Sequence, residues 1–69
     1  MMRHEVRSSS IAAIEETGRG TMIVEFVNRG KYEYFGVPYE VIQEFVNADS
    51  VGRYFNQNIR GQYREEFRT

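Results

Sequence analysis

The most regular alternation of apolar and polar side chains in the chain occurs at residues 21–27. Met22, Val24 and Phe26 fall on one side of an extended backbone, and Glu25 falls on the other. β-Branched and aromatic residues dominate this run, as is typical of a strand. We therefore predict a strand whose three apolar side chains face the core.

Two further segments have a weaker strand pattern. Residues 31–35 alternate, with Tyr32 and Tyr34 on one face, and we interpret both as core side chains with a polar tip rather than as an exposed binding platform. Residues 8–15 form the first predicted strand, although their apolar side chains fall on both faces.

Short segments that contain glycine separate the three predicted strands. Gly18 and Gly20 lie between the first two strands, and Gly30 ends a three-residue loop that begins at Asn28. Glycine tolerates the left-handed backbone conformation that tight hairpins need. The pattern therefore predicts a three-stranded antiparallel β-meander within an α+β fold.

Two short helices are predicted after the meander, both packed on one sheet face. The first begins at Pro38, which suits the first turn of a helix, and runs to about Asn47. Asp49 or Ser50 caps the second helix, which ends near Gly61. Apolar residues recur every three or four positions in each helix: Val41, Ile42, Phe45 and Val46 in the first, and Val51, Tyr54, Phe55 and Ile59 in the second.

The two ends of the chain carry charge with little periodicity. Residues 1–7 are expected to fray, as termini do when no sheet captures them. At the other end, Tyr63 and Phe67 could prolong a helical face, while the charged residues around them are equally compatible with a frayed tail over residues 64–69. The prediction is one domain, with its core between about residues 6 and 63.

Length and composition allow one small globular domain. A chain of 69 residues with 41% hydrophobic residues can build one core, whereas a disordered chain would be poor in apolar residues. The chain has no Cys, so we expect neither disulfides nor thiolate metal sites. No segment is long and apolar enough to span a bilayer and no signal peptide is visible, so the expectation is a cytoplasmic protein without membrane contact.

The chain offers little of the chemistry that an active site needs. His4 is the single histidine and lies near the amino end without a partner motif, while Ser8, Ser9 and Ser10 have no base beside them. The carboxylates are scattered along outward positions, which argues against a metal cage. We therefore expect a non-enzyme with no catalytic residue, no metal and no cofactor.

Three arginines and no acidic residue fall in and just after the predicted second helix, namely Arg53, Arg60 and Arg64. Guanidinium groups form forked bonds to carboxylate or phosphate, and Asn56 shares a helix face with Arg60 because the two are four residues apart. Together with Tyr34 on the sheet, these residues are the candidate surface for a protein partner or a nucleic acid.

A competing interpretation makes this surface purely structural. The arginines would then form ion pairs with Glu40 or Glu44, or face other glutamates across a solvated surface. Tyr54 and Phe55 lie on the helix face assigned to the core, so packing is favoured for both over stacking on nucleic-acid bases.

Several short motifs occur in an order that resembles the KTSC domain family. They are, in chain order, Ser8-Ser9, Phe26, Gly30-x-Tyr32-x-Tyr34, Val37-Pro38 and Ala48-x-Ser50-x-Gly52-x-Tyr54-Phe55-Asn56-x-x-Ile59-Arg60-x-x-Tyr63. Small departures are the third serine, Ser10, and Phe35-Gly36 before Val37-Pro38. The resemblance implies a compact accessory domain without an established biochemical activity, found in small bacterial and phage proteins and at the carboxyl end of some lysyl-tRNA synthetases.

The residues and the resemblance together favour a non-enzymatic interaction module that contacts an unidentified protein partner. RNA binding, of the tRNA type, is the alternative, and it is based on the arginines and the aromatic residues between them. A small anionic nucleotide is a third class of ligand, which needs a concave pocket that a domain of this size is expected to form only as an oligomer.

Overall fold

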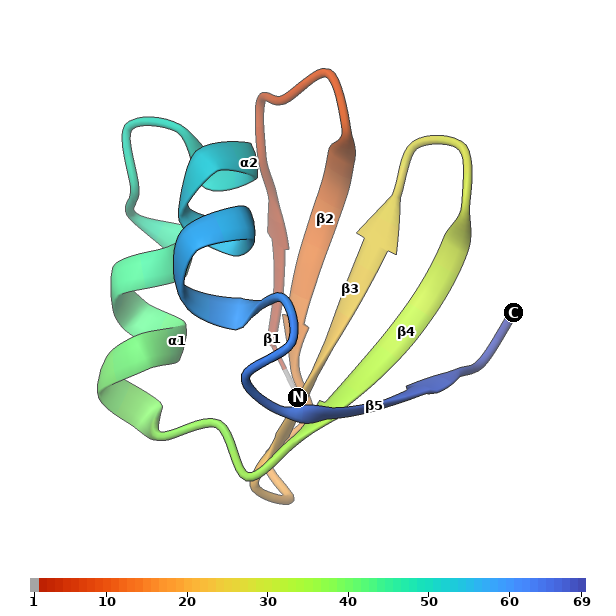
Figure 1. The fold of residues 1–69 in the computed structure, drawn as a ribbon, viewed down its shortest axis with the longest axis vertical. Coiled ribbons are helices and arrows are strands. Elements are labelled where there is room, and N and C mark those ends of the chain that lie inside the picture. Colours follow the sequence, from red (N-terminus) through yellow and green to blue (C-terminus); the bar gives the residue numbers. More distant parts are fainter. Residues whose placement is uncertain (1) are drawn as a thin grey trace.

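The computed structural model, which describes residues 2–69, has one antiparallel sheet with helices on one of its faces (Figure 1). Neighbouring strands in the sheet follow one another in the sequence, as in a meander. The strands are β1 (Met2–Glu5), β2 (Ile11–Glu16), β3 (Thr21–Phe26), β4 (Gly30–Phe35) and β5 (Arg64–Phe67). Between β4 and β5 come α1 (Tyr39–Val46), α2 (Val51–Tyr54) and the π-helix η1 (Phe55–Ile59).

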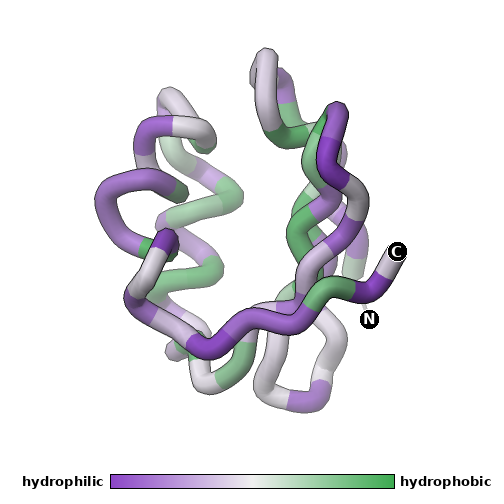
Figure 2. The backbone as a smooth tube through the Cα atoms, turned by 45° about the vertical axis from the view of Figure 1, so that its right-hand side comes forward, coloured by the Kyte–Doolittle hydropathy of each residue, from purple (hydrophilic) through white to green (hydrophobic). Residues whose placement is uncertain are grey.

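The core lies between the sheet and the helices. Met22, Val24 and Phe26 on β3 are buried, as the alternation predicted. Tyr34 on β4 is 1% exposed, which confirms its core position, and Tyr32 beside it is half-buried. Apolar stretches of the helices and of the strands lie on both sides of the space between the two layers in Figure 2.

The first predicted strand is displaced from its expected position. It begins at Ile11, because Ser8 Oγ accepts the backbone N–H groups of Ser10 and Ile11 and folds residues 8–10 into a loop. The pairing of β2 with β3 shifts between Ile11 and Ala13. This irregularity turns both Ile11 and Ile14 toward the core, which explains why the apolar side chains did not alternate simply.

The helices form close to where the sequence predicted them. Pro38 is the N-cap of α1, and Ser50 rather than Asp49 caps α2, with its Oγ accepting the backbone N–H of Arg53 at 3.2 Å. α2 continues into the π-helix η1, where the Arg60 N–H donates to the Phe55 carbonyl at 2.9 Å. Among residues 2–69, no helix has the length and apolar content needed to cross a bilayer.

The sheet has five strands and not three, so the prediction of frayed ends is wrong over most of both termini. β1 pairs with β2 and β5 pairs with β4, each antiparallel, at opposite edges of the sheet. A helical continuation from Tyr63 is also excluded, because Phe67 lies in β5 with its ring 5.3 Å from that of Tyr32. Edge strands are commonly short and charged, and four-residue strands of this kind leave no alternation for a sequence reading to find.

A buried carboxylate on the face away from the helices helps to hold β5 in place. Glu33, which is 6% exposed, accepts hydrogen bonds from Thr21 Oγ1 at 2.6 Å and from Arg68 Nε at 2.9 Å. The hydrogen bond from Thr21, followed by Arg68, lowers the pKa of Glu33 despite its burial. The carboxylate therefore links β3 and β4 to the residue after β5.

Gly30 lets the end of the chain pass close to the β3–β4 hairpin. Its φ is +81°, as expected for the last residue of this loop. A Cβ at Gly30 would lie 2.9 Å from the Thr69 carbonyl carbon and 3.1 Å from the Phe67 ring. Only glycine therefore fits both the turn and the close approach of the last strand.

We predict that Gly30→Ala lowers the free energy of unfolding by about 1–3 kcal/mol more than Gly20→Ala, because only the former overpacks against β5. Gly20 is the matched control, since its φ is also +81° and nothing lies within 4 Å of a Cβ built there. The left-handed conformation alone should cost about 1–2 kcal/mol in either variant. Urea denaturation measures the difference, and equal losses would show that β5 does not press on Gly30.

The Glu33 carboxylate should make the stability of the fold depend on pH. Because the folded pKa of Glu33 lies below its unfolded value, its contribution to stability is present above the unfolded pKa and is lost as pH falls through the folded pKa. Glu33→Gln should therefore destabilise the protein by about 1.5–3 kcal/mol at neutral pH. The difference between wild type and variant should shrink in acid, as measured by denaturation at pH values from neutral downward, and a difference independent of pH would contradict it.

Candidate functional site

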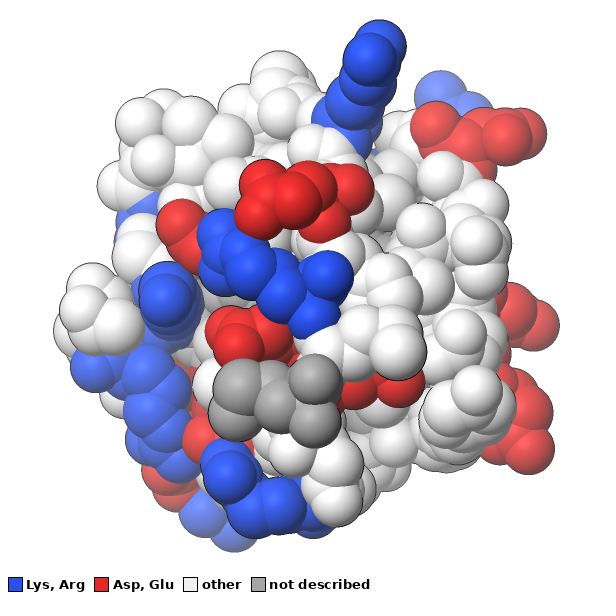
Figure 3. Space-filling view, turned by 180° about the vertical axis from the view of Figure 1, so that it is seen from behind, with Lys and Arg blue, Asp and Glu red and all other residues white. Residues whose placement is uncertain are grey.

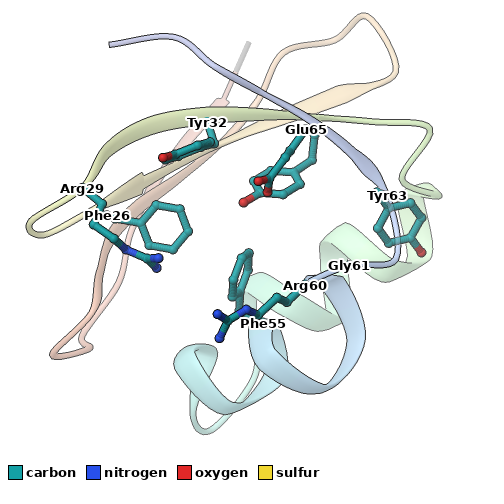
Figure 4. A pocket seen from close by; sticks show the side chains of 9 residues that line it. Phe26, Arg29, Tyr32, Phe55, Arg60, Gly61, Tyr63 and Glu65 are labelled. Atoms are coloured by element: carbon teal, nitrogen blue, oxygen red, sulfur yellow. The ribbon is translucent and has the colours of Figure 1, made fainter.

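Among the concave pockets beside the helices, two contain predicted site residues, and the first of these is lined by aromatic rings (Figure 4). This aromatic groove has a volume of about 330 Å³. Its lining residues are Phe26, Arg29, Tyr32, Tyr34, Phe55, Arg60, Gly61, Tyr63 and Glu65. They come from the β3–β4 hairpin, from η1 and the segment that follows it, and from β5, so segments far apart in the sequence build one site.

The floor of the groove is a set of rings in edge-to-face contact. Phe55, at the start of η1, has its ring centroid 5.2 Å from that of Phe26 and 5.7 Å from that of Tyr34. The three side chains are at most 6% exposed, so they present little ring surface to solvent. Tyr32 and Tyr63 are half-buried at the sides. The groove thus offers an apolar floor and two partly accessible rings.

Two exposed arginines border the groove. The Arg29 guanidinium carbon lies 4.5 Å from the centroid of the Phe26 ring, a cation–π contact that holds the side chain over the floor. Arg60 donates a long hydrogen bond of 3.5 Å to Asn56 Oδ1. Within residues 2–69, neither arginine has a carboxylate within ion-pair distance.

An acidic side chain lies on the sheet side of the groove. Glu65 on β5 is the cross-strand neighbour of Tyr34, and Figure 4 shows it among the side chains that line the groove. Burial, and then the hydrogen bond to Glu65, raise the pKa of the Tyr34 hydroxyl. The Tyr34 hydroxyl therefore stays protonated beside Glu65.

The second pocket, which we name the serine pocket, is polar. It has a volume of about 360 Å³ and lies where the β1–β2 loop meets the start of α2. Its lining residues are Arg7, Ser8, Ser9, Ser10, Asp49, Ser50, Val51, Gly52, Arg53 and Asn56. A single chain forms both pockets, so neither requires oligomerisation.

The structure divides the predicted site residues between these pockets. Tyr34 and Arg60 line the aromatic groove, whereas Arg53 and Asn56 line the serine pocket. The hydrogen bond between Asn56 and Arg60 connects the two. Arg64 joins neither pocket, because it lies on β5 facing away from the helices, 4.3 Å from the Phe35 ring and paired with Glu66.

The purely structural interpretation of this surface is confirmed for its aromatic residues but not for its arginines. Within the described chain, Arg53 and Arg60 form no ion pair with Glu40 or Glu44, and Glu44 instead accepts from the Tyr54 hydroxyl at 2.8 Å. Burial and this hydrogen bond raise the pKa of Tyr54 to about 12. Core packing of both aromatic residues is confirmed, since Phe55 is 6% exposed and Tyr54 stacks on Phe45 at 5.6 Å.

Sequence reasoning missed Arg29, Glu65 and Arg7. Arg29 lies in a hairpin loop, and an arginine there becomes notable only when the register brings it beside the rings of β4 and η1. Glu65 could not be predicted as a site residue because the sequence did not reveal its strand, β5. The triple serine after Arg7 was the one available signal, because hydroxyl groups beside an arginine can form a polar loop.

His4 has a partner that the sequence did not reveal. Its Nε2 lies 2.6 Å from the Glu16 carboxylate across the β1–β2 pair, and this contact lowers the pKa of Glu16. The expectation of an isolated histidine is therefore wrong. Over residues 2–69, the acidic and histidine side chains form no group of three or more that could hold a metal ion.

Comparison with known proteins gives concordant results for sequence and fold. A family model of the KTSC domain matches residues 7–63. The crystal structure of a KTSC domain protein from Yersinia pestis aligns with a TM-score of 0.91 and 32% identity, and covers 99% of this chain and 97% of that protein. An uncharacterized protein of Stutzerimonas stutzeri is 38% identical over 64 residues, which are 91% of this chain and 90% of the relative.

The same comparison finds part of a much longer enzyme. A lysine–tRNA ligase of a Nostoc species is 46% identical over 46 residues, which are 67% of this chain and 8% of the ligase. A lysine–tRNA ligase of Trichormus variabilis is 41% identical over 51 residues, or 74% of this chain and 9% of the ligase. The chain thus matches less than a tenth of the length of these ligases.

Proposed function

This chain belongs to the KTSC domain family, and from that premise we propose that it is a non-enzymatic binding module whose aromatic groove holds an acidic segment of a partner protein. One observation carries the proposal: Arg29 and Arg60 border an apolar floor, and neither is neutralised by a carboxylate of the described chain. A partner protein that supplies a carboxylate would form ion pairs with these arginines.

The arginines favour a carboxylate because their side chains are already positioned. Arg29 rests on the Phe26 ring, and Arg60 is tethered to Asn56. Less rotamer freedom is therefore lost when a ligand binds. The planar guanidinium matches the two oxygens of an Asp or Glu side chain, so forked hydrogen bonds can form.

The floor adds an apolar requirement. Phe26 and Phe55 meet edge to face beneath the groove, and Tyr32 and Tyr63 flank it. A leucine or phenylalanine of the partner, next to its acidic residue, would displace water from this surface and gain apolar burial. Glu65 lies on the sheet side of the groove, and its carboxylate can accept hydrogen bonds from backbone N–H groups of the partner's segment.

RNA is the second candidate, favoured by one observation in particular: lysine–tRNA ligases contain a similar segment. Base stacking needs accessible ring faces, however, and Phe26, Tyr34 and Phe55 are at most 6% exposed. The formal net charge is -1, and Figure 3 shows blue and red side chains interleaved on the far side of the molecule. A broad basic surface for a phosphate backbone is therefore lacking on that side.

We predict that short blocked peptides with Phe next to Glu bind the groove, and that the same peptides with Gln in place of Glu bind at least about tenfold more weakly. Titration of the isotope-labelled protein should shift the amide resonances of Arg29, Tyr32, Arg60 and Glu65. The double variant Arg29→Ala/Arg60→Ala should abolish the preference for Glu over Gln, because it removes both guanidinium groups.

The matched control is Arg19→Ala/Arg64→Ala, which removes the same charge from exposed positions outside both pockets. It should keep the preference for Glu. Equal binding of both peptides, or equal losses in both double variants, would contradict the proposal. Shifts of the groove resonances caused by a single-stranded RNA oligonucleotide, steeply reduced by salt, would replace the protein partner by RNA.

A further inference from the structure

We propose that the serine pocket binds the phosphate group of a small phosphorylated ligand, independently of the aromatic groove. The pocket lies where two connections meet, the β1–β2 loop and the start of α2, which are adjacent at one end of the molecule in Figure 1. Both sides of this junction carry an exposed arginine: Arg7 comes from the loop and Arg53 from α2.

A glycine lets the serine loop approach the helix closely. A Cβ at Gly52 would lie 3.2 Å from Ser10 Oγ and 3.6 Å from Ser8 Oγ, so the serine hydroxyls rest directly on the helix where it has no side chain. Gly52 is helical and has no positive φ that would require glycine for the backbone. Its small size is therefore needed for the close approach of the serine loop.

The hydrogen bonds of the pocket leave mainly donors free. Ser8 Oγ accepts two backbone N–H groups, so its own hydroxyl is left to donate to Ser10 Oγ, 3.3 Å away. Ser50 Oγ accepts the backbone N–H of Arg53, which leaves its hydroxyl hydrogen available. Asn56 Oδ1 accepts from Arg60, which leaves the Asn56 amide N–H groups. A ligand rich in acceptors and poor in donors suits this arrangement.

The charges select an anion. Within residues 2–69, Arg7 and Arg53 have no carboxylate within ion-pair distance, and both are exposed. Asp49 is the one acidic residue of the lining, so the formal charge of the pocket is positive. Phosphate offers more acceptor oxygens than a carboxylate, and two arginines with hydroxyl and amide donors match it.

The remaining features indicate what the phosphate is attached to. A pocket of about 360 Å³ has room for more than a bare phosphate ion. The Asp49 carboxylate can accept from hydroxyl groups, which a sugar supplies. The ligand class is therefore a phosphorylated sugar or a nucleotide rather than inorganic phosphate alone.

The test is a titration of the labelled full chain with ribose phosphate, with free ribose and with inorganic phosphate. We expect ribose phosphate to shift the amide resonances of Ser10, Gly52, Arg53 and Asn56, inorganic phosphate to shift them more weakly, and free ribose to leave them unchanged. Arg7→Ala/Arg53→Ala should weaken binding at least about tenfold, because each charged contact contributes strongly. Gly52→Ala retains every charge but narrows the pocket, and should weaken binding as well.

Arg19→Ala/Arg64→Ala is again the control of equal charge and should bind as tightly as the wild type. Equal weakening in this control, unchanged binding in Gly52→Ala, or no response to either phosphate compound would overturn the proposal. An RNA oligonucleotide without a terminal phosphate tests whether the bound phosphate comes from a nucleic-acid backbone. If it shifts the same resonances, and Arg7→Ala/Arg53→Ala removes the shifts, the phosphate belongs to a nucleic-acid backbone. Peptide binding to the aromatic groove should survive Arg7→Ala/Arg53→Ala, so the two proposals can fail separately.

Discussion

The ring of Phe55 holds the helical layer against the sheet, and the rest of the molecule is arranged around this contact. It meets Phe26 and Tyr34 of the sheet edge to face and lies 6.2 Å from Phe45 of α1. Aromatic side chains bury more surface area than the other residues of a small core. Phe55 thus fixes α1, η1 and the sheet relative to one another with a single side chain.

Phe55 and the π-helix that it begins contribute residues to both pockets. Its ring is part of the floor of the aromatic groove, and the π-helix that it begins carries Asn56 toward the serine pocket and ends before Arg60 at the groove. π-Helical turns are often found at functional sites, where they adjust the direction of side chains. The hydrogen bond between Asn56 and Arg60 joins one lining residue of each pocket across one turn of this element.

The arginines fall into two groups, according to whether they pair with a carboxylate. Those with carboxylate partners are Arg3, Arg19, Arg64 and Arg68, and those without such a partner in the described chain are Arg7, Arg29, Arg53 and Arg60. The first group stabilises the face away from the helices, where Glu33 is buried. The second group borders the two pockets. A net charge of -1 therefore conceals local positive charge at both candidate sites.

The sequence predicted those parts of the structure in which one face is apolar and the other polar. Phe26, Phe45 and Phe55 were recognisable as core because their neighbours alternate with the period of their element. β1 and β5 have no such pattern, and only pairing at the sheet edges makes them strands. Arg53, Asn56 and Arg60 were predicted from a stretch of arginines without acidic residues and from helical spacing, and they line the two pockets, but Arg29 and Glu65 required the register of the sheet, which local spacing does not encode.

A nuclear Overhauser measurement between aromatic ring protons of the full chain in solution tests most directly whether Phe55 holds the helices against the sheet. We expect strong effects from the Phe55 ring to the rings of Phe26 and Tyr34, whose centroids lie 5.2 Å and 5.7 Å away. A well-dispersed spectrum in which the Phe55 ring has no contact with either sheet residue would contradict it.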